Sequence, residues 1–346
     1  MKVAADGPAA TFRGPHISGY TRDVMNMTAR LNVFRGLVFR CFAVLLFVLL
    51  MPGLSVHGGE HGSLRLGLMP AVNSIPLLVA QSEGFFADEG VSVELEMFRD
   101  QLYRETSLQT GRIDGSVSDL VNAVNAWYNG FPVQVASRTD GLFALLTSAR
   151  SGIASIDAWP TRGRVQLGAL QDSVIFYEAY RMLAAHGIGP ERLDLVPTFQ
   201  IPQRMEMLLQ GQLQAAMLPE PVAFLAAAQG AHVILDTRML ESTATVMLFT
   251  PDAMRTKAQA IRAFFRAYNR AVDAVNANPD SFRDVIVADG EFPPPVRDTM
   301  IIPVFERARV PTEAEFEHLV DWMRNRGMIS RRPAYRDIVD PRYLPD

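Results

Sequence analysis

Hydrophobic and polar positions follow two different periods from residue 64 onwards. Residues 91–97 alternate apolar and polar side chains, which is the period of a half-exposed strand, and residues 64–69 read as a shorter strand. Between them, residues 75–87 carry a helical period that begins with Pro76 in the first turn and stops before Gly90. This segment is therefore predicted to be a β-α-β unit with a parallel sheet and a right-handed crossover.

The alternation of strand and helix continues to about residue 235. Further strands are predicted at 113–117, 132–138, 164–169, 193–196, 213–218 and 232–235, and helices at 102–111, 119–129, 173–186, 202–210 and 220–229. After Pro251 the strand pattern stops, and helices are predicted at 253–277, 280–289 and 312–326. Arg262, Arg266 and Arg270 lie on one face of the first of these, which we interpret as a solvated face that pairs with Asp and Glu.

Two stretches of the chain resemble one another at a shift of 100 residues. In each stretch a glycine follows one helix and a second glycine follows the next helix, with the same spacing: Gly111 and Gly130, then Gly211 and Gly230. Each glycine is also explained locally, because helices often end at a residue in the left-handed conformation. The preferred interpretation is two similar α/β lobes, the first near 60–148 and the second near 150–248.

The first 58 residues differ from the rest in charge and hydropathy. They hold six basic and two acidic groups, a net charge of 6 − 2 = +4. Three arginines precede the apolar run 41–51, and small residues follow it up to Gly58, which is the layout of a secretory signal peptide. The run is shorter than the roughly 20 residues of a membrane span. We expect cleavage near Ser55–Gly59 and a periplasmic protein; an uncleaved anchor is the alternative. Cys41 stands at the start of the run, directly after Arg40, so no lipoprotein site is predicted.

Residues 59–346 are acidic and contain no cysteine. They carry 33 − 6 = 27 basic and 37 − 2 = 35 acidic groups, a net charge of −8, which argues against nucleic acid or an anionic membrane as the main partner. The lack of cysteine excludes disulfides, thiolate metal sites and cysteine nucleophiles in this part. No two histidines of this part are spaced as His-x-x-x-His, and no nucleophile elbow, phosphate loop or dinucleotide fingerprint is present. We therefore expect no catalytic residue, no metal and no cofactor, and favour binding.

Ligands of open parallel sheets bind beyond the carboxyl ends of the strands, and two such lobes would face each other across a cleft. The candidate ligand-binding residues of these loops are Asn73, Asp100, Gln101, Ser118 and Asp119 in the first lobe, and Gln171, Asp172, Ser173 and Glu220 in the second, with Tyr177 as an aromatic side chain near the start of its helix. Several of them also suit helix N-caps, worth about 1 kcal/mol each. Carboxylates outnumber Arg99 and Arg138, which favours a ligand with hydrogen-bond donors or positive charge.

Residues 66–95, which begin Leu-Gly-Leu-Met-Pro and contain Ala-Gln-Ser-Glu-Gly-Phe-Phe, resemble the opening of periplasmic substrate-binding proteins of ABC importers. The branch that it resembles serves sulfonates, taurine, nitrate and thiamine-pyrimidine precursors, and residues 108–114 and 210–221 resemble two further segments typical of it. The loops that the resemblance implies to touch ligand are those of Asn73, Gln101, Ser118, Asp172-Ser173 and Glu220.

The resemblance also implies a fold, a two-lobed type II periplasmic-binding-protein fold of the α/β class. Each lobe would be a mostly parallel sheet flanked by helices, with crossover strands near 145–150 and 247–250 as the hinge. The chain would divide into a leader (1–58), a first lobe with the C-terminal helices (59–148 plus 251–346) and a second lobe (149–250).

The expected function is that of a monomeric periplasmic solute receptor. It would bind a small nitrogen-containing compound, pyrimidine-like or otherwise aromatic, and deliver it to an ABC permease in the inner membrane. Three alternatives stay open. The first is a receptor for a sulfonate-, taurine- or nitrate-type anion, held by Arg99 or Arg138 and helix N-termini. The second is an enzyme on the same fold that uses Asp119, Asp172 or Glu220 as general acid or base. The third is a sensor that passes its signal to a receptor kinase.

Overall fold

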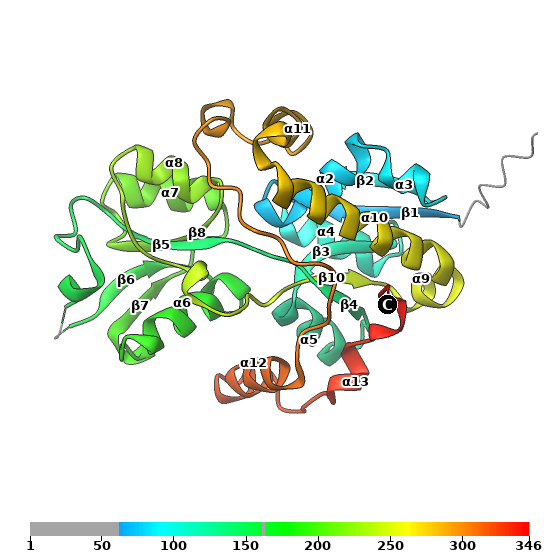
Figure 1. The fold of residues 1–346 in the computed structure, drawn as a ribbon. Coiled ribbons are helices and arrows are strands. Elements are labelled where there is room, and N and C mark those ends of the chain that lie inside the picture. Colours follow the sequence, from blue (N-terminus) through cyan, green and yellow to red (C-terminus); the bar gives the residue numbers. More distant parts are fainter. Residues whose placement is uncertain (1–61, 161–162, 346) are drawn as a thin grey trace, which may run out of the picture. The chain divides into compact units, whose positions relative to one another are not determined.

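A computed structural model describes residues 62–160 and 163–345 of the chain, so the predicted signal peptide lies outside the described residues. The strands form two five-stranded sheets, ordered β2-β1-β3-β10-β4 and β7-β6-β8-β5-β9 (Figure 1). Their bounds are β1 Ser63–Leu68, β2 Ser92–Met97, β3 Gly115–Asp119, β4 Gln134–Arg138, β5 Phe143–Thr147, β6 Val165–Gly168, β7 Leu193–Val196, β8 Ala215–Pro219, β9 His232–Asp236 and β10 Thr245–Phe249.

Helices connect and cover these strands. Their bounds are α2 Ile75–Ser82, α3 Phe85–Asp88, α4 Gln101–Gln109, α5 Leu120–Tyr128, α6 Val174–Ala185, α7 Ile201–Leu209, α8 Val222–Ala228, α9 Pro251–Thr256, α10 Ala258–Ala277, α11 Arg283–Asp289, α12 Glu313–Asn325 and α13 Tyr335–Ile338. Short 3₁₀ turns are η1 Val72–Ser74, η2 Ile156–Ala158, η3 Pro190–Arg192, η4 Thr237–Met239, η5 Pro279–Phe282, η6 Pro294–Val296 and η7 Pro341–Tyr343. The predicted helices 75–87 and 253–277 are each divided in two, at Gly84 (φ 73°) and at Lys257 (φ −119°).

Each sheet is parallel except for one strand. β1 runs parallel to β2 and β3, and β6 runs parallel to β7 and β8. β10 runs antiparallel to β3 and β4, and β5 runs antiparallel to β8 and β9. These two antiparallel strands join the lobes, since the chain enters the second sheet through β5 and returns to the first through β10. The predicted α/β architecture of two mostly parallel sheets is confirmed.

The chain crosses between the lobes earlier than predicted. β4 ends at Arg138 and β5 begins at Phe143, so the first crossing is residues 139–142; β9 ends at Asp236 and β10 begins at Thr245, so the second is residues 237–244. The predicted crossover strands near 145–150 and 247–250 overlap β5 and β10, which each begin two residues earlier in the chain. The physical reason is that β5 and β10 are completely buried strands inside the sheets, where pairing with β8 and β3 covers all five residues of each and pairing with β9 and β4 covers four.

The 100-residue repeat inferred from the glycines extends to strand order and register. Gly115–Asp119 pairs with β10 in the same way as Ala215–Pro219 pairs with β5, residue for residue. Both antiparallel strands also show a register shift on the opposite side, between Met247 and Leu248 in β10 and between Leu145 and Leu146 in β5. The two lobes are therefore two copies of one supersecondary plan, and each can serve as an internal comparison for the other.

The two copies also share a buried arginine. Arg104 and Arg204 occupy the fourth position of α4 and α7, and they are 5% and 1% exposed. Each packs beneath a glycine of the neighbouring strand: a Cβ added at Gly67 would lie 3.2 Å from Cγ of Arg104, and one added at Gly168 would lie 3.2 Å from Cγ of Arg204. A Cβ at either strand position would therefore crowd the arginine stem, and glycine leaves room for it.

We expect Gly168→Ala to lower the free energy of unfolding by about 1–3 kcal/mol, because the added methyl overpacks the core. Its Cβ would lie 2.5 Å from Cδ1 of Leu213. Urea denaturation followed by circular dichroism measures the loss. Gly67→Ala, whose Cβ would lie 2.7 Å from Cδ1 of Ile113, should behave alike. Unchanged unfolding midpoints in both variants would contradict this packing.

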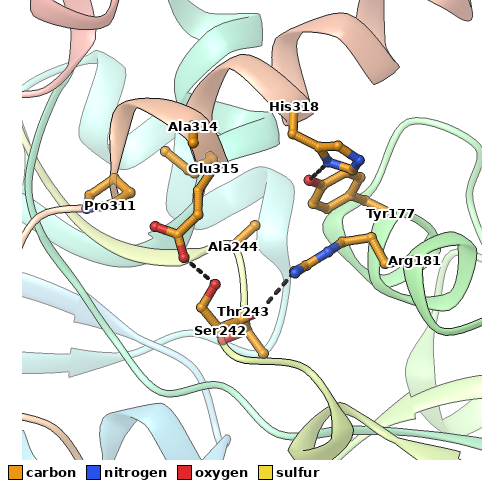
Figure 2. Close-up of a pocket in the computed structure, with 10 residues that line it drawn as sticks. Tyr177, Arg181, Ser242, Thr243, Ala244, Pro311, Ala314, Glu315 and His318 are labelled. Atoms are coloured by element: carbon orange, nitrogen blue, oxygen red, sulfur yellow. Dashed lines mark hydrogen bonds between the residues drawn. The ribbon is translucent and has the colours of Figure 1, made fainter. Parts of the chain in front are cut away.

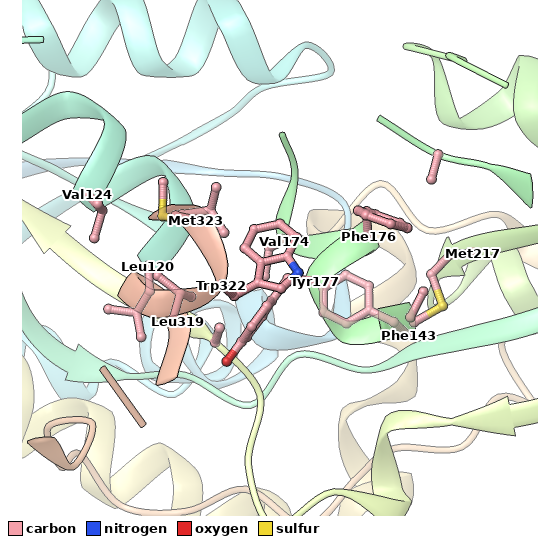
Figure 3. Close-up of a cluster of buried hydrophobic side chains, with 14 of the residues drawn as sticks. Leu120, Val124, Phe143, Val174, Phe176, Tyr177, Met217, Leu319, Trp322 and Met323 are labelled. Carbon is pink, nitrogen blue, oxygen red and sulfur yellow. The ribbon is translucent and has the colours of Figure 1, made fainter. Parts of the chain in front are cut away.

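The C-terminal helices pack mainly on the first lobe. α10 and α2 share a core under the first sheet, and α12 packs against α5 through Leu319 and Met323, close to Leu120 and Val124 (Figure 3). The predicted pairing of the α10 arginines is confirmed for two of them, since Arg266 and Arg270 form ion pairs with Asp88 and Glu89. In contrast, one end of α12 reaches the second lobe, where Trp322 packs on Tyr177 of α6 (Figure 3).

Candidate ligand-binding site

A cavity of about 280 Å³ opens where the two lobes and α12 meet (Figure 2). We call it the hinge pocket. It is lined by Leu120, Tyr177, Arg181, Ser242, Thr243, Ala244, Pro311, Ala314, Glu315 and His318. These residues come from the start of α5, from α6, from the return crossing and from the segment that contains the start of α12. Its volume lies just below the roughly 300–1,000 Å³ typical of small-molecule sites, so it suits a solute of few heavy atoms.

The second lobe contributes Tyr177 and Arg181, which are four residues apart and so share one face of α6. The guanidinium carbon of Arg181 lies 5.6 Å from the centre of the Tyr177 ring. Nη1 of Arg181 donates to Oε2 of Glu178 at 3.0 Å and to the carbonyl of Ser242 at 2.7 Å. The arginine therefore ties α6 to the return crossing and is held in the pocket wall.

α12 contributes His318, which meets Tyr177 across the pocket. The Tyr177 hydroxyl and Nδ1 of His318 lie 2.8 Å apart. Partial burial, together with the charge of Arg181, lowers the pKa of His318, and burial raises the pKa of Tyr177. The imidazole is therefore neutral and the phenol protonated at neutral pH, so Tyr177 donates to Nδ1 and Nε2 of His318 carries the proton.

Glu315 closes the other side of the pocket and uses both its oxygens on protein groups. Oε1 accepts from Nη1 of Arg138 at 3.2 Å and from the hydroxyl of Ser242, and Oε2 accepts from the backbone N–H of Thr312 at 2.7 Å. Burial opposes ionisation, but the hydrogen bonds from Ser242 and Thr312 and the charge of Arg138 outweigh it, and the pKa of Glu315 is lowered. Glu315 is thus an ionised structural group at the mouth of the pocket.

Glu178 lies completely buried behind the pocket. Its Oε1 accepts from the backbone N–H of Ala244 at 2.7 Å, which joins the second lobe to the return crossing. Burial raises the pKa of Glu178 to about 7, although Arg181 and the N–H of Ala244 act in the opposite direction. The hinge therefore contains a carboxyl group that changes charge near neutral pH.

Beside the pocket, the first lobe holds five polar side chains, which we call the polar cluster: Arg104, Glu105, Ser118, Asp119 and Asn122. Nη2 of Arg104 donates to Oε1 of Glu105 at 2.6 Å and to the Ser118 hydroxyl at 3.3 Å. Asn122 donates to Asp119 through its backbone N–H at 2.8 Å and through Nδ2 at 2.7 Å. Burial raises the pKa of Asp119 to about 7 against the effect of these N–H groups, with Glu105 adding to the rise.

The structure gives most of the predicted carboxylate and hydroxyl ligands a capping role. The N-caps are Asp100 for α4, Asp119 for α5 and Ser173 for α6, and Glu220 accepts from the N–H of Phe224 at the start of α8. Asp119 and Ser118 are both 5% exposed, whereas Asp100 lies at the surface. The surplus of carboxylates in these loops is therefore a weak indicator of ligand charge, because helix N–H groups already use three of them.

Of the predicted site residues, Tyr177 lines the hinge pocket, and Asp119 immediately precedes Leu120, which also lines it. Asn73 is buried in η1 beyond β1, Gln101 is exposed in the first turn of α4, and Gln171 and Asp172 are exposed before α6. None of these four lines the pocket. Their contact with a ligand stays a prediction.

Sequence reasoning missed Arg181, Ser242, Glu315 and His318. One signal was available, since Thr312-x-x-Glu315 is a capping box and marks the start of α12. Nothing local indicates that this helix returns to face α6, because Tyr177 and His318 are 141 residues apart in the chain.

Two features are absent from the described ranges. In residues 62–160 and 163–345, no group of three or more His, Cys, Asp or Glu side chains is arranged to hold a metal ion. The helices of these same ranges include none with the length and apolar character needed to cross a membrane.

Comparison with known proteins places this architecture in a family. The model of the family described as "NMT1/THI5 like" matches residues 71–282, which is more than half of the chain. The protein belongs to the NMT1/THI5-like family. The resemblance to periplasmic substrate-binding proteins that residues 66–95 predicted is confirmed.

Sequence relatives include transport proteins. The chain is 26% identical over 203 residues to a bicarbonate transport ATP-binding protein of Synechocystis, covering 52% of this chain and 30% of that protein. It is 22% identical over 240 residues to a putative ABC transporter periplasmic binding protein of Brachyspira hyodysenteriae, covering 65% and 69%. The chain covers only 30% of the length of the bicarbonate transport ATP-binding protein.

A solved structure shows the same fold. The alkanesulfonate-binding protein SsuA of Xanthomonas axonopodis pv. citri, bound to MOPS, superposes with a TM-score of 0.66 at 14% identity, over 80% of this chain and 98% of that one. The two-lobed periplasmic-binding-protein fold expected from the sequence is confirmed.

Proposed function

We propose that the protein is the periplasmic solute receptor of an ABC importer, which encloses a small solute between its lobes and delivers it to a permease in the inner membrane. The observation that carries this proposal is the hinge pocket, whose walls come from both lobes and from α12. A solute there would contact elements that move relative to one another, so its binding would favour the closed state. The family and the transport relatives support the same conclusion.

The geometry favours binding over catalysis. Glu315 and Glu178 accept hydrogen bonds from protein groups, and Tyr177 is protonated and directed at His318. Asp119 and Glu220 were considered as general acids or bases. Both accept hydrogen bonds from backbone N–H groups at helix starts. Polar groups held in this way are suited to orienting a solute, and we propose no catalytic residue among them.

We propose a nitrogen-containing solute of small size, with one end that accepts hydrogen bonds and another that donates them. Among the residues that the structure describes, Arg181 makes its hydrogen bonds through Nη1, so Nη2 and Nε can serve a solute acceptor. The hydroxyl oxygens of Ser242 and Thr243, which line the same pocket, can accept from solute N–H groups. An amino-substituted heteroaromatic ring has both kinds of group. The alternative is an anion, which Arg181 would also suit and which the relative named for alkanesulfonate binding supports.

A thermal-shift screen tests the receptor proposal. The purified protein is heated with a library of pyrimidines, amines, sulfonates and flavins, and a rise in Tm is expected with one chemical class. At a solute concentration of 100 times Kd, the stabilisation is about 2.7 kcal/mol. The absence of any shift, together with turnover of one library member, would contradict a receptor.

We expect Arg181→Gln to raise the Kd of the solute by about 10-fold or more, because a hydrogen bond from a charged group contributes about 1.5–3 kcal/mol. Isothermal titration calorimetry measures the Kd of the solute for each variant. Arg332→Gln is the matched control, since Arg332 pairs with Glu317 and Asp321 of α12 and does not line the pocket. Equal affinities of the two variants would contradict a role for Arg181 in binding.

A further inference from the structure

Helix α12 touches the two lobes with two adjoining faces. Towards the first lobe it presents Leu319 and Met323, whose aliphatic side chains pack against α5 (Figure 3). The chain that follows α12 stays on this lobe, since the backbone N–H of Asp340 donates to the carbonyl of Val135 in β4 at 2.9 Å. α12 is therefore held on the first lobe both by its own side chains and by the segment after it.

The adjoining face carries Trp322 and Arg326, which meet α6 of the second lobe. The ring centres of Trp322 and Tyr177 are 5.0 Å apart, and those of Trp322 and Tyr180 are 6.4 Å apart. The guanidinium carbon of Arg326 lies 4.7 Å from the centre of the Phe176 ring. We call these five side chains the clasp, because they join the two lobes outside the chain crossings.

The clasp lies in a core that both lobes share. Buried apolar side chains continue from Val124 of the first lobe through Trp322 to Met217 in the second sheet (Figure 3). Of the cores within the described ranges, this is the one whose buried members come from both lobes. A second contact between the lobes, made by Phe224 and Leu225 of α8, consists of side chains that are only partly buried. The clasp is therefore the deeper of these two contacts.

Two further ties of α6 end on the return crossing. Glu178 accepts from the backbone N–H of Ala244, and Arg181 donates to the carbonyl of Ser242. The crossing is part of the hinge and can turn with α6, so these bonds can persist when the lobes move apart. α12 is held on the first lobe and cannot follow. The clasp is thus the contact that an opening motion would separate.

Polar atoms within the clasp favour a contact that can separate. Nε1 of Trp322 and Nε of Arg326 are buried and have no hydrogen-bond partner among the described residues. A buried donor without a partner costs free energy that contact with water would return. Leu319 and Met323, on the face towards the first lobe, bury no such donor. The closed clasp is therefore stabilised by ring packing and opposed by two donors that opening would hydrate.

We propose that the clasp opens and closes the hinge pocket: α12 stays on the first lobe, and its contact with α6 sets the balance between closed and open receptor in the absence of solute. The pocket and the clasp share Tyr177, whose hydroxyl lies 2.8 Å from Nδ1 of His318 in the pocket wall. Release of α6 separates these two side chains and opens that wall. A solute that contacts both of them favours the closed clasp in turn. The inference rests on the proposed receptor function and names the contact that controls its opening.

Single-molecule energy transfer between dyes on the two lobes tests the inference without any solute. Cys41→Ser removes the single cysteine of the chain. Gln109→Cys at the end of α4 and Gln229→Cys directly after α8 then place the dyes at exposed positions, one on each lobe and both outside the clasp. Closed and open molecules differ in the distance between the dyes, so their ratio can be measured.

We expect Arg326→Ala to lower the ratio of closed to open molecules by about 5- to 10-fold, which corresponds to the loss of one cation–π contact. Trp322→Ala should lower it further, because the indole contacts three rings of α6. Arg324→Ala is the matched control, since Arg324 is an exposed residue in the last turn of α12, and it should keep the wild-type ratio.

Hydroxyl-radical modification read by mass spectrometry gives a second measurement. Tyr177 is only 3% exposed in the closed structure, so its modification rate should rise in Arg326→Ala and stay unchanged in Arg324→Ala. Circular dichroism of each variant separates opening from unfolding. Arg326 follows the last residue of α12, so its replacement leaves the helix and its packing on the first lobe in place.

Two outcomes would overturn the inference: a ratio of closed to open molecules that is unchanged in both Arg326→Ala and Trp322→Ala, or an equal change in Arg324→Ala. Both are measured without solute, so they leave the receptor proposal standing. Binding of no member of the solute library would instead remove the receptor proposal, and with it the role of the clasp in admitting a solute.

Discussion

Replacing Trp322 with alanine is expected to lower the free energy of unfolding by about 3–5 kcal/mol, the cost typical of removing a large buried aromatic side chain. Trp322 is 5% exposed and packs edge-on against Tyr177 with ring centres 5.0 Å apart. Phe176 of α6 packs on the same indole (Figure 3). Tyr180 of α6 also contacts it, and the guanidinium of Arg326 lies 5.5 Å from its centre. The substitution would therefore remove the main apolar contact between α12 and the second lobe.

Urea denaturation measures this loss, with Trp127→Ala as the control. Trp127 lies on α5, is only partly buried, and has the guanidinium of Arg331 at 4.4 Å from its ring centre. Its removal should cost clearly less than removal of Trp322. Equal losses in the two variants, or a loss for Trp322→Ala below the roughly 3 kcal/mol typical of a buried aromatic side chain, would mean that α12 does not hold the second lobe.

Replacing Glu178 with glutamine is expected to change how stability depends on pH. The folded protein holds the Glu178 proton up to a pKa of about 7, whereas the ordinary value is 4.5. As pH rises from 4.5 to 7, the unfolded chain releases this proton first, so wild-type stability falls relative to a variant that cannot ionise. Each unit by which the pKa in the folded protein exceeds the pKa in the unfolded chain changes the free energy of unfolding by about 1.4 kcal/mol. The difference between wild type and Glu178→Gln should therefore change by up to about 3 kcal/mol between roughly pH 4 and pH 8.

Denaturation curves recorded across this pH range measure the difference. Glu206→Gln is the control, because Glu206 is an exposed residue of α7 and its removal should leave the pH dependence unchanged. A difference between wild type and Glu178→Gln that stays constant with pH would show that Glu178 ionises in the folded protein as it does in the unfolded chain. The hinge would then lack a carboxyl group that changes charge near neutral pH.

The sequence predicted the fold well where local patterns carry it. Alternating strands and helices, and helix stops such as Gly111 and Gly211, are set by periodicity and by left-handed backbone conformation, so the two lobes and their repeat could be read directly. The crossover strands β5 and β10 were predicted two residues late, because an apolar run does not indicate where a strand begins or which sheet it joins. Strand pairing decides which sheet each run joins. Phe143 pairs with Pro219 and Thr245 pairs with Asp119, and the partners of both pairs are far apart in the sequence.

The site was less accessible to sequence reasoning. Helix starts were correctly recognised, but a residue such as Asp100 has the same sequence signature whether it caps a helix or meets a ligand. The hinge pocket depends on α12 returning to α6, and that contact rests on aromatic packing between segments that are far apart in the chain.

A crystal structure of the protein with the solute that gives the strongest thermal shift tests the central claim most directly. A two-lobed receptor predicts one intact solute molecule in the hinge pocket, with an acceptor atom within hydrogen-bond distance of Arg181. Density for the solute on an outer face of one lobe, or for a chemically altered product in the pocket, would contradict the account.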